Sequence, residues 1–328
     1  MKKAKILFIL HLPPPIHGSS VVGQYIKDST IINETFRSVF TNLGTSTTVD
    51  EIGKKPLTKI IRYLKILHNV FSSLLFNKFD IVYLAITSKG IGFYKDFPIA
   101  LLAKLFGENL VLHYHNKGVS NRQHKVFDNL LYKILFKNTK VILLSKHLFE
   151  DVKKYVKPSE VYFCPNGIPV IKYENTDLSN NEITKILFLS NLIESKGVFV
   201  LLTALKILKD KKVIFHCNFV GGEGDISKEI FDKKVRLLKL TDCVFYLGKK
   251  HNEEKTKIFL KSNIFVFPTF YHNETFGLVN LEAMLFGLPV ITTNEGGIPD
   301  LVKDNETGFL VEKQNPNQLA EKIEWLIK

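Results

Sequence analysis

Short apolar runs of strand length alternate with longer helical stretches, and this alternation constrains the fold more than any other feature of the sequence. The runs are rich in Val, Ile, Leu and Phe and almost uninterrupted, which is typical of parallel strands covered on both faces. In the first half they are Lys5–Leu10, Ile81–Ile86, Leu110–His113, Val141–Leu144 and Val161–Phe163, and in the second half Ile186–Leu189, Val213–Val220, Val244–Leu247, Ile264–Phe267 and Val290–Thr292. Two such series in a chain of 328 residues predict an α/β protein of two doubly wound, Rossmann-like domains rather than one barrel.

The boundary between the two series is a turn cluster, Pro165-Asn166-Gly167-Ile168-Pro169, followed by the polar segment Tyr173–Glu182. Such residues favour turns and irregular chain over helices and strands. We therefore predict an N-terminal domain over 1–168, a linker over 169–183 and a C-terminal domain over 184–328. Because ligands of these folds bind beyond the carboxyl ends of the strands, the two domains are expected to face each other across one cleft.

The composition excludes several classes of protein. No stretch approaches 18 uninterrupted apolar residues, so a transmembrane helix is not expected. The basic, apolar N-terminus lacks a small-residue cleavage site and breaks at Pro13-Pro14-Pro15, which favours a buried strand over a signal peptide. Three scattered cysteines, Cys164, Cys217 and Cys243, are too few for a disulfide framework or a zinc site and are expected to be core thiols in a reducing cytoplasm.

The excess of positive over negative charge lies entirely in the first half of the chain. Residues 1–170 carry 24 Lys and Arg against 11 Asp and Glu, whereas residues 171–328 carry 21 of each. The segment Lys54–Lys78 interleaves these bases with apolar residues at helical spacing, as in helices that lie on anionic membranes. An ordinary surface helix packed on the sheet, and a charge excess that is merely solvated, stay open as alternatives. Nucleic acid is the less favoured polyanion, because no binding motif with stacking aromatics accompanies the charge.

Residues 268–302 form the strongest chemical pattern. A polar loop follows the strand that ends at Phe267, and a helix is expected to run from about Gly277 to Gly287. The backbone N–H groups of Phe276, Gly277 and Leu278, together with the helix dipole, then suit a phosphate. Glu274 in the loop and Glu282 on the helix are eight residues apart, so they can contact two separated parts of an extended ligand, such as a sugar and the hydroxyl groups of a ribose.

This stretch resembles the glutamate–seven residues–glutamate signature of the family 4 retaining glycosyltransferases, which adopt the GT-B fold. The matching residues are Glu274, Phe276-Gly277-Leu278, Glu282-Ala283, Gly287, Pro289-Val290-Ile291 and Gly296-Gly297, while Asp300 stands where the family usually has glutamate. Upstream, Lys196-Gly197 match the family's Lys-Gly pair, and Asn191 stands where an arginine is expected.

The resemblance implies roles for individual residues. It assigns Gly18, Asn191, Lys196, Phe276, Gly277, Leu278 and Glu282 to donor binding, His115 and Glu274 to catalysis, and His17 and Ser19 to the acceptor-side loop. The family histidine lies at the end of the fourth strand, where His113 and His115 are both available. We favour His115, because the small polar Asn116 follows it.

The resemblance further implies transfer of a hexosyl-type unit from a nucleoside diphosphate sugar to an acceptor hydroxyl, with retention and without a protein nucleophile. The acceptor is expected to be a glycan or a lipid-linked glycan in bacterial surface polysaccharide assembly, and the enzyme to be cytoplasmic and peripheral on the inner face of the plasma membrane. Neither a metal nor another cofactor is expected, because no Asp-x-Asp stands near a strand end and no His/Cys cluster exists.

Two alternatives remain from the sequence: a nucleotide-sugar 2-epimerase of the same fold, and a basic nucleic-acid-binding protein that is not an enzyme. Family members usually continue with a long C-terminal helix. The sequence ends at Lys328 before such a helix, which suggests a chain truncated at its C-terminus.

Overall fold

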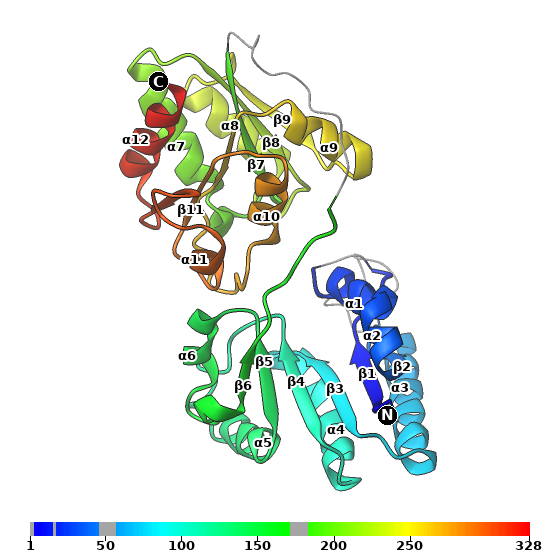
Figure 1. The fold of residues 1–328 in the computed structure, drawn as a ribbon. Coiled ribbons are helices and arrows are strands. Elements are labelled where there is room, and N and C mark those ends of the chain that lie inside the picture. The colour runs from blue at the N-terminus through cyan, green and yellow to red at the C-terminus, as the bar shows by residue number, and fades with distance from the viewer. Residues whose placement is uncertain (1–2, 16–17, 46–56, 171–182) are drawn as a thin grey trace. The chain divides into compact units, whose positions relative to one another are not determined.

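The computed structural model describes residues 3–15, 18–45, 57–170 and 183–328. The chain divides into two units, Met1–Asn166 and Gly167–Lys328, each built on one parallel sheet of six strands (Figure 1). The division falls two residues before the predicted end of the first domain. Of the predicted linker, residues 171–182 lie outside the described residues.

The sheet of the N-terminal unit has the order β2-β1-β3-β4-β5-β6, and all neighbouring strands run parallel. Its strands are β1 (Lys5–Leu10), β2 (Arg37–Asn42), β3 (Ile81–Ile86), β4 (Leu110–Tyr114), β5 (Lys140–Leu143) and β6 (Val161–Phe163). Its α-helices are α1 (Gly18–Asp28), α2 (Thr30–Thr35), α3 (Leu57–Phe76), α4 (Gly90–Leu105), α5 (Val126–Phe136) and α6 (Phe149–Val152).

Helices α3, α4 and α5 form one layer of this unit. Each of them joins two strands in the same direction along the sheet, and such crossovers are right-handed, so the three helices cover the same face. Accordingly α3 packs on α4, and α4 packs on α5, as Figure 1 shows. The connection from β1 to β2 runs in the opposite direction, which places α1 and α2 on the other face.

The sheet of the C-terminal unit has the order β12-β11-β10-β7-β8-β9. Its strands are β7 (Thr184–Leu189), β8 (Phe215–Val220), β9 (Val244–Gly248), β10 (Ile264–Phe267), β11 (Val290–Thr293) and β12 (Gly308–Val311). Its α-helices are α7 (Val198–Asp210), α8 (Lys228–Leu237), α9 (Asn252–Leu260), α10 (Leu278–Leu285), α11 (Ile298–Leu301) and α12 (Pro316–Ile327), and a short 3₁₀ turn, Glu194–Lys196, precedes α7. Counted from β7, this is the Rossmann order, in which the direction of travel reverses between β7 and β10.

All ten predicted strands are present, and the sequence analysis missed two more, β2 and β12. Both lie at the edge of their sheet. Strand β2 reads RSVFTN and is only partly buried, so it lacks the continuous apolar run that marks a central strand. Strand β12 has only four residues, GFLV, of which two are buried.

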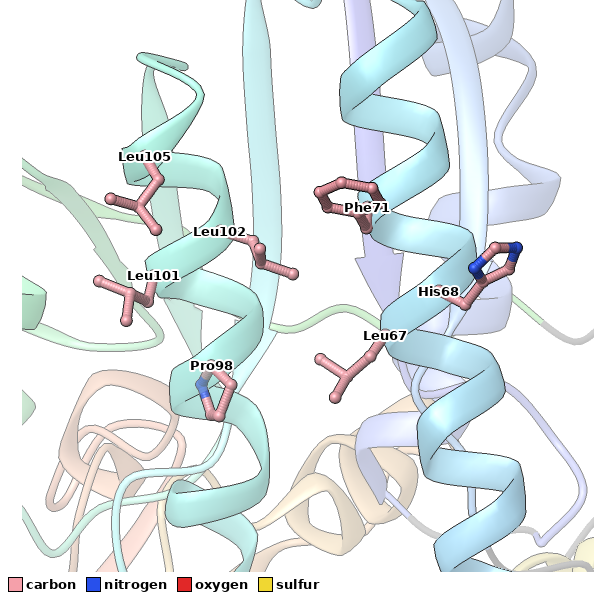
Figure 2. A pocket seen from close by; sticks show the side chains of 7 residues that line it. All are labelled: Leu67, His68, Phe71, Pro98, Leu101, Leu102 and Leu105. Atoms are coloured by element: carbon pink, nitrogen blue, oxygen red, sulfur yellow. The ribbon is translucent and has the colours of Figure 1, made fainter.

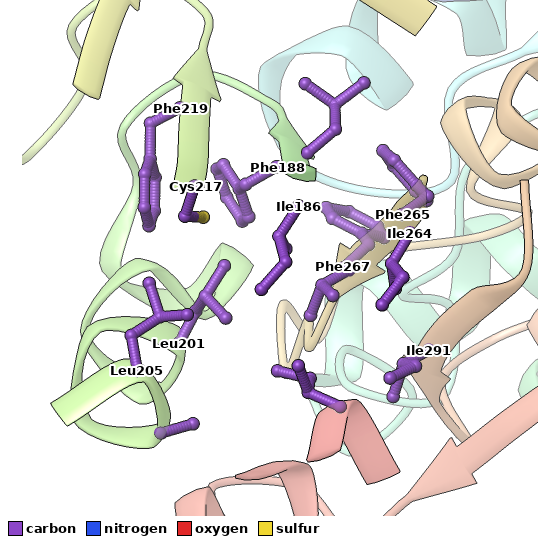
Figure 3. Packing of buried hydrophobic residues seen from close by; sticks show 14 of the residues in the cluster. Ile186, Phe188, Leu201, Leu205, Cys217, Phe219, Ile264, Phe265, Phe267 and Ile291 are labelled. Carbon is purple, nitrogen blue, oxygen red and sulfur yellow. The ribbon is translucent and has the colours of Figure 1, made fainter. Parts of the chain in front are cut away.

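The core of the C-terminal unit lies between the sheet and its helices. Figure 3 shows Phe188 and Phe219 of two adjacent strands next to Leu201 and Leu205 of α7, and all four side chains are buried. Cys217 lies among them, and Cys243 is buried in the same core. The expectation of core thiols is therefore confirmed for these two cysteines and wrong for Cys164, which is exposed at the end of edge strand β6.

Within the described residues, no helix is both long enough and apolar enough to cross a bilayer.

Gly197, the N-cap residue of α7, allows the loop after β7 to lie against the loop after β10. Its φ is +90°, and a Cβ atom at this position would stand 2.3 Å from the carbonyl oxygen of Pro268. The neighbouring backbone is held in place, because Phe270 N–H donates a hydrogen bond of 2.8 Å to the carbonyl of Ser195. Only glycine fits this approach.

We expect Gly197→Ala to lower the free energy of unfolding of the C-terminal unit by roughly 2–4 kcal/mol, from left-handed backbone strain and a backbone clash. Gly248→Ala is the matched control: its φ is +68° but no atom lies within 4 Å of the added Cβ, so only the strain of roughly 1–2 kcal/mol applies. Urea unfolding of both variants measures the difference. Equal losses would mean that the close approach contributes nothing.

Candidate functional site

The reversal between β7 and β10 defines the candidate site of the C-terminal unit. These two strands are neighbours in the sheet, and the loops that leave their carboxyl ends diverge from there. Crevices at such reversals bind ligands in open parallel sheets. The loop after β7 carries Asn191 and Lys196, and the loop after β10 carries Glu274. The topology therefore brings together residues that are 78 positions apart.

Lys196 and Glu274 form an ion pair across this reversal. The Lys196 ammonium nitrogen lies 2.5 Å from Oε2 of Glu274, and their side chains are only 16% and 12% exposed. The ammonium also lies 4.5 Å from the centre of the Tyr271 ring and 5.5 Å from that of Phe267. Because both charges are largely withdrawn from water, each depends on the other for compensation. Lys196 was predicted to bind the donor and Glu274 to take part in catalysis, but their mutual ion pair was not foreseen.

Glu282 has a partner of its own, Lys255 of α9. The Lys255 ammonium nitrogen lies 2.8 Å from one carboxylate oxygen of Glu282 and 2.7 Å from the other. Lys255 could not be singled out from the sequence, since residues 249–261 contain five lysines in no distinctive pattern. The pair leaves the carboxylate held in one orientation at the surface of α10.

The turn before α10 is fixed by backbone geometry. The helix begins at Leu278, one residue later than predicted, and Gly277 is its N-cap with φ +66°. A Cβ at Gly277 would lie 2.7 Å from the side-chain nitrogen of Asn280, so the turn requires glycine. Phe276 is buried, and the N–H of Gly297 donates a 2.7 Å hydrogen bond to the carbonyl of Thr275. The Gly296-Gly297 pair therefore holds the turn that carries Glu274.

Asn191 lies in the loop after β7, where its side-chain oxygen accepts a 3.1 Å hydrogen bond from the N–H of Gly222. The structure thus ties this side chain to the glycine-rich turn after β8. One polar pair near the site was not predicted from the sequence. The buried carboxylate of Glu295 accepts a 2.6 Å hydrogen bond from the Lys313 ammonium.

In the N-terminal unit, Gly18 and Ser19 lie in the first turn of α1, while His17 lies outside the described residues. A Cβ at Gly18 would have no neighbour within 4 Å, so crowding does not require glycine there.

His113 and His115 lie together at the carboxyl end of β4, with ring centres 4.1 Å apart. His113 is 4% exposed, and its Nδ1 is hydrogen-bonded to the hydroxyl of Tyr83. Burial lowers the pKa of His113 well below its usual range, and burial together with the charge of His11 lowers the pKa of His115 to about 4. Both imidazoles are therefore neutral at pH 7. His115 follows the strand and is partly exposed, which makes it the more accessible of the two.

Asp151 organises the loop that follows His115. Its two carboxylate oxygens accept hydrogen bonds from the N–H groups of Gly118, Val119 and Ser120, at 2.7, 3.1 and 3.0 Å, and from the Ser120 hydroxyl at 2.6 Å. At the start of the loop, Asn116 accepts a 2.8 Å bond from the N–H of Ser88. The sequence analysis missed Asp151, because no local pattern links it to a loop some thirty residues earlier.

Across the described ranges, no group of three or more His, Cys, Asp or Glu side chains is arranged to hold a metal ion. The expectation that the reaction needs no metal stays a prediction.

Residues 171–328 match the family model described as "Glycosyl transferases group 1". CapM of Staphylococcus aureus, a capsular polysaccharide biosynthesis glycosyltransferase, is 33% identical over 219 residues, which are 60% of this chain and 55% of CapM. The amylovoran biosynthesis glycosyltransferase AmsK of Erwinia amylovora is 31% identical over 140 residues, 42% of this chain and 34% of AmsK. The chain thus spans about half of CapM and a third of AmsK.

The structural similarity extends over both units. HepE of Anabaena in complex with UDP superimposes with a TM-score of 0.75 over 98% of this chain and 90% of HepE, at 19% identity. In complex with UDP-glucose the same protein gives a TM-score of 0.68 over 99% and 90% of the two chains, also at 19% identity. The predicted fold class is confirmed: the protein is α/β with two Rossmann-like domains of the GT-B type.

The pKa of His115 predicts a pH dependence of stability. A histidine in an unfolded chain titrates near 6.5. The unfolded state therefore binds more protons between about pH 6.5 and the folded pKa of about 4. The free energy of unfolding consequently falls as the pH falls through this window.

Wild type should lose free energy of unfolding between pH 7 and pH 4.5, and we expect this loss to be smaller by roughly 1–3 kcal/mol in His115→Gln. Urea unfolding of wild type and variant near pH 7 and near pH 4.5 gives the difference of differences, in which other titrating groups cancel. The exposed His124, changed to Gln, serves as the control and should leave the pH dependence unchanged. The same loss in His115→Gln as in wild type would contradict the low pKa.

Proposed function

We propose that this chain, whose C-terminal unit matches the group 1 glycosyltransferases, transfers a sugar from a nucleoside diphosphate sugar to an acceptor hydroxyl. The observation that carries the proposal is the Lys196–Glu274 pair at the strand reversal of that unit. It places a cation suited to a diphosphate beside a carboxylate suited to sugar hydroxyls, at the position where such sheets bind nucleotides.

The donor is held by the diphosphate and the ribose. Lys196 and the N–H groups at the start of α10 bind the diphosphate, since a helix N-terminus and an ammonium both attract anions. Glu282, oriented by Lys255, accepts hydrogen bonds from the ribose hydroxyls. The UDP and UDP-glucose in the HepE complexes support a nucleoside diphosphate sugar as the ligand class.

The reaction exchanges one bond at the anomeric carbon for another. The bond from that carbon to the diphosphate oxygen breaks, the bond to the acceptor oxygen forms on the same face, and the acceptor's proton passes to the departing phosphate. Lys196 compensates the charge that develops on the leaving group. Binding of the diphosphate draws Lys196 away from Glu274, which leaves this carboxylate able to contact the sugar. His115 of the N-terminal unit is proposed as a catalytic group, because its neutral imidazole can donate or accept a hydrogen bond.

The acceptor is proposed to be a glycan of a bacterial surface polysaccharide. CapM and AmsK, which match this chain, carry capsular polysaccharide and amylovoran biosynthesis in their names. The charged and polar character of the candidate site suits hydroxyl-rich substrates. A screen of nucleotide sugars with glycan acceptors, in which the products are separated, distinguishes transfer from hydrolysis and from epimerisation of the donor.

We expect Lys196→Ala and Glu282→Ala each to weaken nucleotide binding by roughly 1–3 kcal/mol, because each removes a charge-assisted hydrogen bond. Calorimetry with UDP, the nucleotide of the HepE complexes, is the first measurement. The control is Glu254→Ala, which removes an exposed carboxylate on α9 that pairs with Lys250. Lys196→Met/Glu274→Gln removes both charges of the pair, so it should bind as weakly as Lys196→Ala without leaving a lone buried charge. Unchanged affinity in Lys196→Ala and Glu282→Ala would remove the donor from this site.

We expect Glu274→Gln and His115→Gln to reduce kcat by at least about tenfold, because both are proposed to act on the sugar. Nucleotide affinity should change by less than about threefold in His115→Gln and should not fall in Glu274→Gln, which frees Lys196 from its carboxylate partner. Steady-state kinetics with the donor found in the screen, beside calorimetry with the nucleotide alone, separates the two effects. His124→Gln is the matched control for the histidine. A turnover rate close to wild type in either variant would exclude that residue from catalysis.

A further inference from the structure

The outward face of α3, α4 and α5 in the N-terminal unit is unusually apolar for a surface exposed to water. Large apolar side chains that are at least 40% exposed occur on all three helices: Leu57, Ile60, Ile61, Leu64, Phe71, Leu75 and Phe76 on α3, Ile91 and Leu105 on α4, and Val126, Phe127, Leu130 and Ile134 on α5. Many large exposed apolar side chains on neighbouring helices are a mark of an interaction site. We call this outward face the helical face.

Helix α3 carries two separate apolar stripes. Ile66, Val70 and Leu74 recur every four residues and are buried against the rest of the unit. Leu64 and Leu75 belong to a second stripe on another side of the helix, and both side chains are more than 50% exposed. One stripe suffices to attach a helix to its sheet, so the second is unexplained by folding.

An apolar groove lies within the helical face, between α3 and α4. Its volume is about 390 Å³, and it is lined by Leu67, His68, Phe71, Pro98, Leu101, Leu102 and Leu105. Figure 2 shows Leu67 and Phe71 of α3 pointing toward Leu102 of α4. The groove adds apolar surface to the helical face.

The charges of the helical face have a single sign. The three helices contain six bases, namely Lys59, Arg62, Lys65, Lys95, Lys104 and Lys133. Their only acids, Asp96 and Asp128, are 0% and 2% exposed. Both acids of these helices are thus buried, with Lys95 lying 3.5 Å from Asp96, and the exposed charges, Lys65 and Lys133, are positive. A surface with both apolar side chains and bases suits a partner with negative head groups above an apolar layer.

We propose that the helical face docks on a lipid bilayer that contains anionic lipids. The exposed side chains of α3, such as Leu64 and Leu75, enter the boundary between head groups and acyl chains, and Lys65 and Lys133 remain among the lipid phosphates. A second copy of the chain fits less well, because it would bring like charges face to face without carboxylates to compensate them. The sequence analysis pointed to residues 54–78 alone. The structure adds α4 and α5, and it shows that the acids of this layer are buried.

The test is co-sedimentation of the full chain with vesicles of phosphatidylcholine, with and without phosphatidylglycerol. We expect binding to the anionic vesicles, little binding to the neutral ones, and release near 1 M salt, where the Debye length is about 3 Å. Lys65→Glu/Lys133→Glu should weaken binding at least about 25-fold, since each base near an anionic surface contributes about fivefold. Leu64→Ser/Leu75→Ser should weaken it roughly tenfold or more through lost apolar burial.

Matched controls come from the C-terminal unit. Lys257→Glu on α9 and Leu237→Ser on α8 change exposed residues of the same types and should leave vesicle binding within about twofold of wild type. Calorimetry with UDP tests the donor site separately, and the variants of the helical face should keep the wild-type affinity.

Four results would overturn the proposal. Equal binding to neutral and anionic vesicles, or wild-type binding by both double variants, would show that the helical face does not dock on anionic lipid. If the chain bound duplex DNA in a salt-sensitive manner, and Leu64→Ser/Leu75→Ser bound it with the same affinity as wild type, the bases would be assigned to nucleic acid. A dimer in sedimentation velocity that this double variant dissociates, without vesicle binding by wild type, would assign the face to a second copy.

Discussion

The candidate site depends on how closely two loops approach each other at the reversal between β7 and β10. Gly197 presents its backbone to the carbonyl of Pro268, at a distance that no side chain would allow. This approach fixes the position of Lys196, the residue before it, relative to the loop that ends in Glu274. The ion pair is therefore a consequence of backbone packing, and its two charges could not meet if the loops were held apart by one methyl group.

The same loop is held from its other side. The N–H of Gly297 bonds to the carbonyl of Thr275, next to Glu274. On the side of β7, Asn191 ties its loop to the turn at Gly222. Each loop of the site is thus anchored to a neighbouring strand end before any ligand arrives. Preorganisation of this kind reduces the ordering that ligand binding requires.

The sequence predicted the fold well, because central parallel strands are buried on both faces and leave continuous apolar runs. It missed two of the four edge strands, β2, which is partly exposed, and β12, which has four residues. In the site, motif resemblance located Lys196, Glu274 and Glu282, whereas Lys255 and Asp151 were missed. Those two act through contacts with distant segments, and a lysine or aspartate gives no local sign of such a contact. The burial of Asp96 and Asp128 was equally invisible, since a helical pattern does not tell which face an isolated acid occupies.

The Lys196–Glu274 pair has a consequence for the end of a catalytic cycle. Lys196 is paired with Glu274 in the structure, so under the proposed function an arriving diphosphate would replace the carboxylate as the partner of this ammonium. After transfer, the nucleoside diphosphate carries more negative charge than the donor did and would be retained by a lone ammonium. Glu274 is a tethered competitor for that ammonium, always present at high local concentration. Under the proposed function, the carboxylate beside Lys196 would therefore limit product inhibition.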